Sequence, residues 1–420
     1  MEKALLVFLD SEDPFLPINY QIEELKNLAF ASLINVVEVV IQKKSKPTPN
    51  FLIGRGKVEE IKNTINDQEI EIVIFNDELS PAQIKNLERE LDVKIIDRSV
   101  LILDIFAKRA QTKEAMLEIE LAQLRYFLPR LVGLTNSLSR QGGTSGSFSA
   151  KGPGEKKLEL DRRRIYNQIN RLEKELVKVH NEKKASAKRR NKSSTPIVGL
   201  VGYTNAGKSA TMNNLIKRST NTKNEVLEKD MLFATLGTNT RRIKLSGFKE
   251  FLLIDTVGFV SKLPHHLVNS FKSTLDSIND CDLLIHIVDS SNPFYEKQME
   301  ITNAVLDELK TVNVPTLFAF SKSDILNNDF LVPSLENSIH FSNQTLDNFE
   351  DLEKRIVSIL SEDYIETDLY IPLSEGKVIS FIESNAIILA KIINEKSIYY
   401  RLRVTEIDFN RYLKDFKELI

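Results

Sequence analysis

The sequence has little of what marks a secreted or membrane-spanning chain. It holds one cysteine, Cys281, so no disulfide can form within the chain, and a reducing compartment is expected. No apolar run approaches the roughly 18 residues of a membrane-spanning helix. The apolar start of the chain stops at Asp10, which is too short for a signal peptide. We therefore expect a soluble, cytoplasmic protein in which Cys281 is a buried free thiol.

The chain also lacks an excess of charge of either sign. Its 57 basic and 59 acidic side chains leave a net charge of −2, so the protein as a whole has no field that attracts nucleic acid. The charge is uneven, however: residues 151–192 carry 15 Lys or Arg and 6 Asp or Glu. This segment has a local charge of +9, which favours a polyanionic partner, although a solvated helix end or linker remains the alternative.

Hydrophobic patterning predicts several α/β units, and at roughly 150 residues per domain the 420 residues suggest two or three domains. In the first 100 residues, short branched apolar runs predict strands at Ala4–Leu9, Val36–Ile41, Ile70–Phe75 and Val93–Ile96. Segments with helical spacing, such as Val58–Ile65 and Pro81–Leu91, lie between them. This alternation is typical of a small α/β layer.

A helical hairpin is expected next. Leucines at steps of four and three from Leu117 to Leu128 form one stripe, and a second runs from Ile165 to Val179. The Gly- and Ser-rich segment Gly133–Gly154 separates them and predicts a loop, which is either functional or a floppy connector. Two such helices joined by a loop indicate an antiparallel pair.

The second half returns to the strand–helix pattern. Strands are predicted at Ile197–Val201, Glu250–Ile254, Leu283–Val288, Thr316–Phe320 and Ser338–Phe341, and, near the end, at Leu369–Ile371 and Ser397–Val404. A helix is predicted across Lys377–Ile393. We expect four units: an N-terminal α/β unit (1–110), a helical hairpin with its basic linker (111–195), a mainly parallel α/β unit (196–364) and a small C-terminal α/β unit (365–420).

The first of three sequence motifs predicts a phosphate-binding loop. A pattern GxxxxGK[ST] follows the strand Ile197–Val201 and opens an apolar-periodic segment, which is the setting of a phosphate-binding loop. Its residues are Gly202, Tyr203, Thr204, Asn205, Ala206, Gly207, Lys208 and Ser209. Backbone N–H groups of such a loop converge on phosphate oxygens beside the positive end of a helix. Lys208 is expected to reach the β- and γ-phosphates and Ser209 to bind Mg²⁺.

A second motif supports the first. Asp255, Thr256, Val257 and Gly258 end the next strand. An Asp in this place can hold Mg²⁺ through water, and the Gly258 N–H can bond to the γ-phosphate. The following residue is Phe259, where Ras-type enzymes carry a water-orienting Gln. Hydrolysis is therefore expected to be slow unless another group completes the site.

A third motif predicts the base. Ser321-Lys322-Ser323-Asp324 follows the strand Thr316–Phe320 in the register of an [NT]KxD motif. The Asp324 carboxylate can accept from N1–H and the 2-amino group of guanine, which adenine does not offer, and a hydrogen bond to a charged group contributes about 1.5–3 kcal/mol. Ser321 is shorter than the usual Asn and is not expected to reach N7. Ser342 is a candidate to complete the base pocket.

Taken with the N-terminal half, these residues resemble the HflX family of translation-factor-class GTPases, a group related to Obg. The matching segments are FLIGRGKVEEI (51–61), NDELSPAQIKNLE (76–88), residues 96–131, SRQGG (139–143), GPGEKKLELDRR (152–163), GYTNAGKS, FATL and DTVGF. The resemblance covers almost the whole chain.

The resemblance implies GTP hydrolysis with Mg²⁺ and binding to the large ribosomal subunit. We expect a cytoplasmic monomer that associates with ribosomes or with the membrane periphery. Family members are associated with splitting or rescuing stalled ribosomes under stress. It implies that Lys208, Thr235 and Gly258 are catalytic and that Phe233 lies at the nucleotide. Among two candidates, Thr235 and Thr240, it favours Thr235 as the threonine that binds Mg²⁺; Asn205 matches a residue that related GTPases use with K⁺. The loop between the helices would contact ribosomal RNA, with candidate contacts Arg140, Lys151, Lys156, Lys157, Arg162 and Arg163.

The chain departs from the family pattern at four places. LDPTTRR is replaced by LGTNTRR at 236–242, GKST by GKSA at 207–210, NKxD by the Ser321 motif, and GETQLETD by GEKKLELD at 154–161. Two other functions therefore remain open at this point. One is a nucleotide-binding ribosome factor that does not hydrolyse, and the other is an adaptor that regulates a membrane-bound protease.

Overall fold

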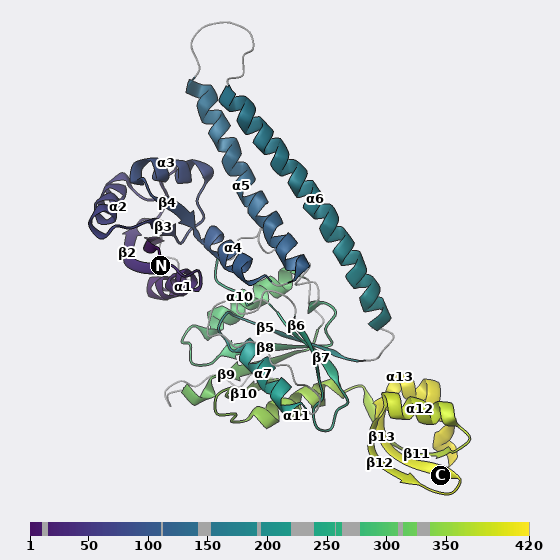
Figure 1. The fold of residues 1–420 in the computed structure, drawn as a ribbon. Helices are drawn as coiled ribbons and strands as arrows, with labels where there is room; N and C mark the ends of the chain where they lie inside the picture. The colour runs from purple at the N-terminus through teal and green to yellow at the C-terminus, as the bar shows by residue number, and fades with distance from the viewer. Residues whose placement is uncertain are drawn as a thin grey trace.

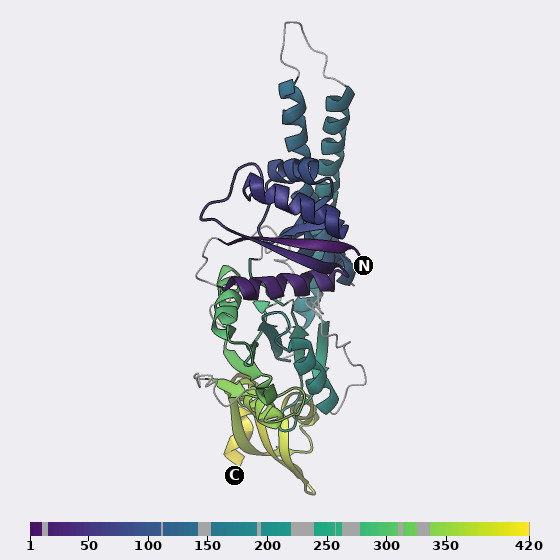
Figure 2. The same cartoon turned by 90° about the vertical axis from the view of Figure 1, so that its left-hand side faces the viewer.

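The structure, a computed structural model, describes residues 1–10, 16–110, 112–141, 153–190, 195–219, 239–256, 258–262, 278–309, 314–325 and 337–419. It contains three β-sheets and a long pair of helices, which we call the arm (Figure 1). The arm extends beyond the first sheet, and the C-terminal sheet lies at the other end of the molecule (Figure 2). The mixed α/β architecture with an antiparallel helical hairpin is the predicted one.

The first sheet is parallel, in the order β2-β1-β3-β4. Its elements are β1 (Lys3–Asp10), α1 (Ile18–Ala31), β2 (Asn35–Lys43), α2 (Arg55–Gln68), β3 (Ile72–Phe75), α3 (Pro81–Leu91), β4 (Lys94–Asp97) and α4 (Arg98–Arg109). Alternate residues of β1 serve opposite cores: Leu6 and Phe8 pack with α1 and α4, and Leu5 and Val7 pack with α2 and α3. Helices on both faces explain why these strands are apolar throughout.

Local chemistry sets where two of these helices begin. Ser80 accepts from the Gln83 N–H while the Gln83 side chain accepts from the Ser80 N–H, and Pro81 is the first helical residue of α3. Asp97 caps α4 by accepting from the Val100 N–H at 3.0 Å.

The arm consists of α5 (Lys113–Gln141) and α6 (Pro153–Arg190). Its seam is made by the predicted stripes: Leu117, Leu121, Ile169 and Leu172 are buried against each other, with Leu124, Leu128, Ile165, Leu176 and Val179 packed on them. The prediction of a loop over Gly133–Gly154 is wrong at both ends, because α5 continues to Gln141 and α6 begins at Pro153. A Gly costs a helix about 1 kcal/mol, which an established helix can absorb because its extension needs no new nucleation.

The central sheet has the order β10-β9-β8-β5-β7-β6, with only β6 antiparallel to its neighbour. Its elements are β5 (Ile197–Gly202), α7 (Lys208–Arg218), β6 (Asn239–Ile243), β7 (Phe251–Asp255), β8 (Leu283–Asp289), α10 (Tyr295–Glu308), β9 (Thr316–Ser321), a 3₁₀ turn (Ser323–Ile325), β10 (Ser338–His340) and α11 (Phe349–Leu360). Helices α7 and α11 cover one face, and α10 lies on the other (Figure 1). The apolar cluster on the α10 face continues into the α1 and α4 face of the first sheet, so the two sheets share one core.

The C-terminal sheet is antiparallel, in the order β11-β13-β12. Its elements are β11 (Tyr364–Pro372), α12 (Gly376–Asn385), β12 (Ile387–Ile393), β13 (Ser397–Thr405), α13 (Glu406–Asp408), a π-helical turn (Phe409–Leu413) and a 3₁₀ turn (Lys414–Leu419). The prediction of one helix over Lys377–Ile393 is wrong. Ala386 is extended and ends α12, and the isoleucine-rich segment after it pairs with β13. Branched side chains favour such a strand once a partner is available.

Among the described residues, no helix combines the length and the apolar character that crossing a bilayer requires.

Candidate nucleotide site

The predicted phosphate loop connects β5 to α7 at the carboxyl edge of the central sheet. Two of its glycines have positive φ, Gly202 at 140° and Gly207 at 96°, where a side chain is strained. A Cβ on Gly202 would also collide with the Ile287 carbonyl oxygen. Gly207 directly precedes α7, so the unpaired N–H groups of the first helical turn face the loop. This is the arrangement that binds an anion.

The Lys208 side chain lies across the loop. Its Nζ donates to the carbonyl oxygens of Gly202 at 2.9 Å and Tyr203 at 2.6 Å. Burial lowers the pKa of Lys208 to about 8, an effect that the Asp255 charge partly offsets. The amine is therefore held inside the loop, beside the position that phosphate oxygens would take.

Two oxygen donors lie next to the loop. The Ser209 hydroxyl donates to Asp255 Oδ2 at 3.1 Å, and Asp255 itself is fully buried at the end of β7. Thr256 donates to the Leu200 carbonyl at 2.6 Å and ties β7 to β5. A hydroxyl and a carboxylate are the hard donors that Mg²⁺ prefers, so this pair fits the predicted metal site.

Gly258 faces the loop from the segment that follows β7. A Cβ there would lie 2.9 Å from Lys208 Nζ and 3.0 Å from Thr204 Cα. The next residue, Phe259, is 2% exposed and belongs to the core shared with the first sheet. Its backbone bridges to Tyr203. The Phe259 ring is therefore packed inside, and it offers the site no polar atom.

The base-reading motif lies at the ends of β9 and β10. Ser321 is fully buried, and its hydroxyl donates to the Ala206 carbonyl at 2.6 Å, within the phosphate loop. Asp324 is exposed and accepts from the Ser342 hydroxyl at 2.6 Å, which orients the carboxylate. Lys322 forms an ion pair of 2.7 Å with Asp289 at the end of β8. Ser342 thus acts on Asp324 through its side chain; its own N–H bonds to the Asp347 carbonyl.

Asn343 is a residue of this region that sequence reasoning missed. Its Nδ2 donates to Thr211 Oγ1 at 3.0 Å and lies 3.4 Å from the Gly207 carbonyl oxygen, and its Oδ1 accepts from Asn214 at 3.2 Å. Asn343 therefore joins the loop after β10 to the start of α7. A single Asn in a loop gives no sequence signal for this contact, because its partners lie about 130 residues away.

Several predicted residues cannot be placed. Phe233, Thr235, Val257 and Lys151 lie outside the described residues.

Thr240 lies on β6, paired with Ile254. Among the candidate RNA contacts, Arg162 and Arg163 are exposed on α6. Arg140, Lys156 and Lys157 belong to the arm helices, but their side chains lie outside the described part of the chain.

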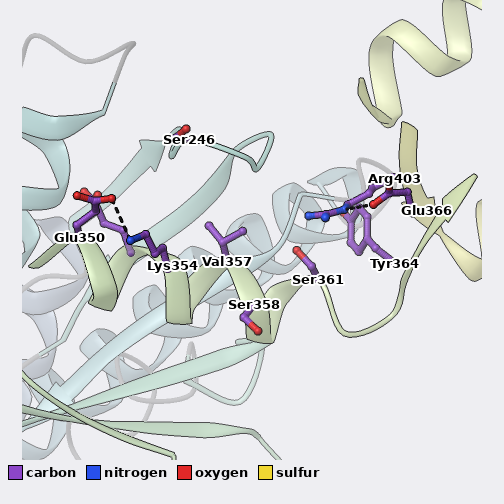
Figure 3. A pocket seen from close by; sticks show the side chains of 10 residues that line it. Ser246, Glu350, Lys354, Val357, Ser358, Ser361, Tyr364, Glu366 and Arg403 are labelled. Carbon is purple, nitrogen blue, oxygen red and sulfur yellow. Dashed lines mark hydrogen bonds and ion pairs between the residues drawn. The ribbon is translucent and has the colours of Figure 1, made fainter. Parts of the chain in front are cut away.

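A separate cavity of about 620 Å³ lies between α11 and β11, away from the phosphate loop (Figure 3). Figure 3 shows two ion pairs at its opposite ends, Lys354 with Glu350 and Arg403 with Glu366. None of the residues that line it belongs to the predicted nucleotide site.

Comparison with known families matches three consecutive parts of the chain. Residues 19–107 match a family described as GTP-binding GTPase N-terminal, residues 109–190 a GTP-binding GTPase middle region, and residues 197–322 a 50S ribosome-binding GTPase. A solved structure, the crystal structure of SsGBP in complex with GDP, aligns with a TM-score of 0.50 at 26% identity. The alignment covers 86% of this chain and 98% of that one.

Full-length relatives give the same result. The chain is 40% identical to the GTPase HflX of Caldanaerobacter subterraneus over 96% of its own length and 91% of the relative's. It is 35% identical to the GTPase HflX of Escherichia coli over 100% and 97% of the two lengths. With the phosphate loop, Asp255 and Gly258 at one edge of the central sheet, these likenesses show that the chain belongs to the HflX family of GTPases.

Proposed function

We propose that the site at residues 202–209 binds GTP with Mg²⁺. In this proposal Lys208 neutralises charge on the β- and γ-phosphates, and Ser209 ligates the metal together with Thr235, while Asp255 holds it through water. A Mg²⁺ ion held by these residues would offset negative charge on the phosphates. The geometry that supports this is the closeness of Lys208, Ser209 and Asp255 at the start of α7. Asn205 is the proposed residue for K⁺.

We assign base selection to Asp324, which its hydrogen bond with Ser342 orients. Ser321 contributes differently from an Asn, because its hydroxyl is bonded to the phosphate loop and does not extend toward a base. Guanine preference should persist with weaker binding, since the carboxylate that reads N1–H and the 2-amino group remains. A ratio of GTP to ATP affinity near one would contradict this assignment.

We further propose that the protein acts at the large ribosomal subunit, in splitting or rescue of stalled ribosomes, and hence in the cytoplasm. In this proposal the four units at 1–110, 111–195, 196–364 and 365–420 are its domains. The exposed Arg162 and Arg163 on α6 support a contact between the arm and ribosomal RNA, because phosphate contacts made by several basic side chains release counterions. Ribosome contact would then accelerate hydrolysis by ordering the loops around the γ-phosphate.

The test is GTP and ATP hydrolysis by the purified chain, with and without large ribosomal subunits, at two salt concentrations. We expect stimulation of GTP turnover that weakens as salt rises. The double variant Arg162→Glu/Arg163→Glu should weaken binding to the subunit. The slope of log affinity against log salt concentration should become shallower by the amount expected for about two lost phosphate contacts. The control variant Lys62→Glu/Lys94→Glu makes the same change of charge on α2 and β4. Its affinity for the subunit should stay near that of the unaltered chain.

The burial of Phe259 favours one second candidate, a ribosome factor that binds nucleotide without hydrolysing it. Phe259 stands at the position where Ras-type enzymes have a water-orienting Gln, and its side chain is buried in the apolar core. Turnover that stays at background with subunits present, while subunit binding still depends on the nucleotide, would establish this candidate instead.

A further inference from the structure

A fully buried ion pair lies where the first sheet meets the central sheet. Arg98 opens α4 and is 2% exposed, and Glu24 of α1 is 7% exposed. Their side chains contact at 2.5 Å. Asn76 accepts a further hydrogen bond from Arg98 Nη1 at 2.9 Å. Removing two charges from water is costly, and it is tolerated only where further hydrogen bonds satisfy the pair.

The remaining partners of this pair come from the central sheet. The Tyr203 hydroxyl donates to the Glu24 carboxylate and accepts from the Ser261 N–H at 2.6 Å. The Ser261 hydroxyl donates to the same carboxylate, and the Ser261 carbonyl accepts from Arg98 Nη2 at 2.9 Å. Glu24 of α1 and Arg98 of α4 therefore hold Tyr203 of the phosphate loop and Ser261 of the segment after β7 at a set separation.

Tyr203 and Ser261 belong to the two backbone segments that surround Lys208. Tyr203 is the second residue of the phosphate loop, and its carbonyl oxygen accepts from Lys208 Nζ at 2.6 Å. Ser261 lies three residues after Gly258, where a Cβ would lie 2.9 Å from that same amine. The two segments are also joined directly, by the Thr204 N–H to the Phe259 carbonyl at 2.8 Å and the Phe259 N–H to the Gly202 carbonyl at 3.2 Å.

The ionisation states of Glu24 and Tyr203 are consistent with the hydrogen bonds of this network. Burial raises the pKa of Glu24, but the Arg98 charge and the hydrogen bonds from Ser261 and Tyr203 outweigh that effect, so its pKa lies below the usual value. Burial and the Glu24 charge hold the pKa of Tyr203 well above its usual range. Tyr203 therefore stays protonated and Glu24 ionised, so the Tyr203 hydroxyl can donate to the Glu24 carboxylate.

We propose that Glu24 and Arg98 are positioning residues for GTP hydrolysis, which act through Tyr203 and Ser261 to fix the phosphate loop against the segment that carries Gly258. The proposal rests on the GTPase activity of the family and is independent of the ribosomal role. Its consequence is specific: the segment with Gly258 serves the γ-phosphate alone, so loosening it should weaken GTP more than GDP.

The test uses the full chain with three variants that each alter one side chain of the network: Tyr203→Phe, Ser261→Ala and Glu24→Gln. The measured quantities are the single-turnover rate with Mg²⁺ and the dissociation constants of GDP and of a non-hydrolysable GTP analogue. We expect the rate to fall about tenfold, because misplacing reacting groups by less than 1 Å is enough for such a loss. Affinity for the GTP analogue should fall at least about fivefold more than affinity for GDP.

A double-mutant cycle separates positioning from general support. If Glu24 acts through Tyr203, the variant Glu24→Gln/Tyr203→Phe should be no slower than the slower single variant. Multiplying losses would overturn the proposal. Because Glu24→Gln leaves Arg98 without its counter-ion and can destabilise the fold, Tyr203→Phe alone, which keeps the ring, must also show the GTP-selective loss.

The matched control is Asp77→Asn, which removes the more exposed ion pair of 3.1 Å between Asp77 and Lys262 at the same junction. It should keep the rate and the ratio of affinities within about twofold of the unaltered chain, as expected of an exposed pair. Lower thermal stability in the three variants with unchanged rate and ratio would mean that the network is structural only, and a loss in Asp77→Asn as large as in Glu24→Gln would assign the effect to the junction as a whole. Either result would overturn the proposal.

Discussion

Gly258 shows how little space the site leaves at a single residue. Any Cβ at this position meets the Lys208 amine at 2.9 Å and the Thr204 backbone at 3.0 Å. The backbone atom cannot yield cheaply, so the amine or the Gly258 segment must shift. In the proposed site, both serve the γ-phosphate.

We predict that Gly258→Ala lowers the single-turnover rate of GTP hydrolysis by about tenfold or more while GDP affinity changes by less than about threefold, since the displaced groups act mainly in the transition state. Gly56→Ala is the control, because a Cβ at Gly56 on α2 meets no atom within 4 Å. Equal losses of GDP and GTP affinity in Gly258→Ala would contradict the assignment of this glycine to the γ-phosphate.

His286 is a second residue whose surroundings decide its chemistry. It is 1% exposed on β8, its ring lies 5.5 Å from that of Phe318, and its Nδ1 has no hydrogen-bond partner among the described residues. Burial lowers the pKa of His286 to about 3, with a further contribution from the Lys208 charge. Between about pH 3 and about pH 6.5 the folded state therefore holds this imidazole neutral, whereas the unfolded chain protonates it.

The resulting pH dependence has a definite sign. Because the folded pKa is depressed, His286 costs no stability above pH 6.5, and stability falls as pH drops from about 6.5 toward about 3. Between pH 7 and pH 5 we expect the unaltered chain to lose about 2 kcal/mol more in its free energy of unfolding than His286→Gln, which cannot be protonated. Urea unfolding at the two pH values measures this, with His340→Gln, at a half-buried position, as the control for a smaller effect. Parallel losses in the unaltered chain and His286→Gln would show that this histidine is not the cause.

At the scale of elements, the arm depends on one narrow seam. Two long helices contact each other along a single row of apolar side chains, of which Leu172 is 1% exposed. Leucines at alternating steps of three and four form such a stripe on any helix, so the seam is readable from the sequence. The length of the two helices cannot be read from the sequence in the same way. Each helix ends where the gain from extending it no longer outweighs the preference of Gly and Ser for non-helical backbone.

We predict that Leu172→Ala destabilises the pairing of α5 with α6 by about 2–4 kcal/mol, as expected for a large-to-small change at a buried site. Hydrogen exchange should show reduced protection in both helices and little change in the central sheet. Val177→Ala, at a position 60% exposed on the same helix, should leave protection unaltered. Uniform loss of protection throughout the chain would mean that the arm does not open as a separate unit.

At the scale of the whole molecule, the central sheet has two unlike junctions. Toward the first sheet it shares a continuous apolar core and the buried network around Arg98. Toward the C-terminal sheet the contact is thin: Phe248 packs with Ile387, its ring lies 5.8 Å from that of Tyr364, and cavities of about 620 and 980 Å³ lie beside them. We therefore expect the C-terminal sheet to be the more easily displaced part.

We predict that Phe248→Ala loosens the C-terminal sheet without affecting the nucleotide site. Limited proteolysis between α11 and β11 should become at least about fivefold faster, corresponding to about 1 kcal/mol of lost contact, because cleavage follows the population of the opened state. The basal rate of GTP hydrolysis should stay within about twofold, since the ring contact of Phe248 is with Tyr364, at the junction with the C-terminal sheet. A comparable loss of hydrolysis would show that this junction also supports the site.

The sequence by itself determined the chemistry of this protein at the level of motifs. The phosphate loop, Asp255, Gly258 and Asp324 are recognisable because each uses residue types with special backbone or charge properties at short, regular spacing from a strand. The two stripes of the arm and most strands are equally local, since each depends on the period of a few apolar residues.

The tertiary structure alone decided the rest. Ile387–Ile393 became a strand because β13 offered a partner, although the sequence predicted a helix. Ser321 bonds to Ala206, and Glu24 to Tyr203, across separations of 115 and 179 residues. Such contacts follow from which surfaces the sheets bury against each other, and no local pattern records them. The contact between α1 and the phosphate loop, made by Glu24 and Tyr203, could therefore be found only in the folded structure.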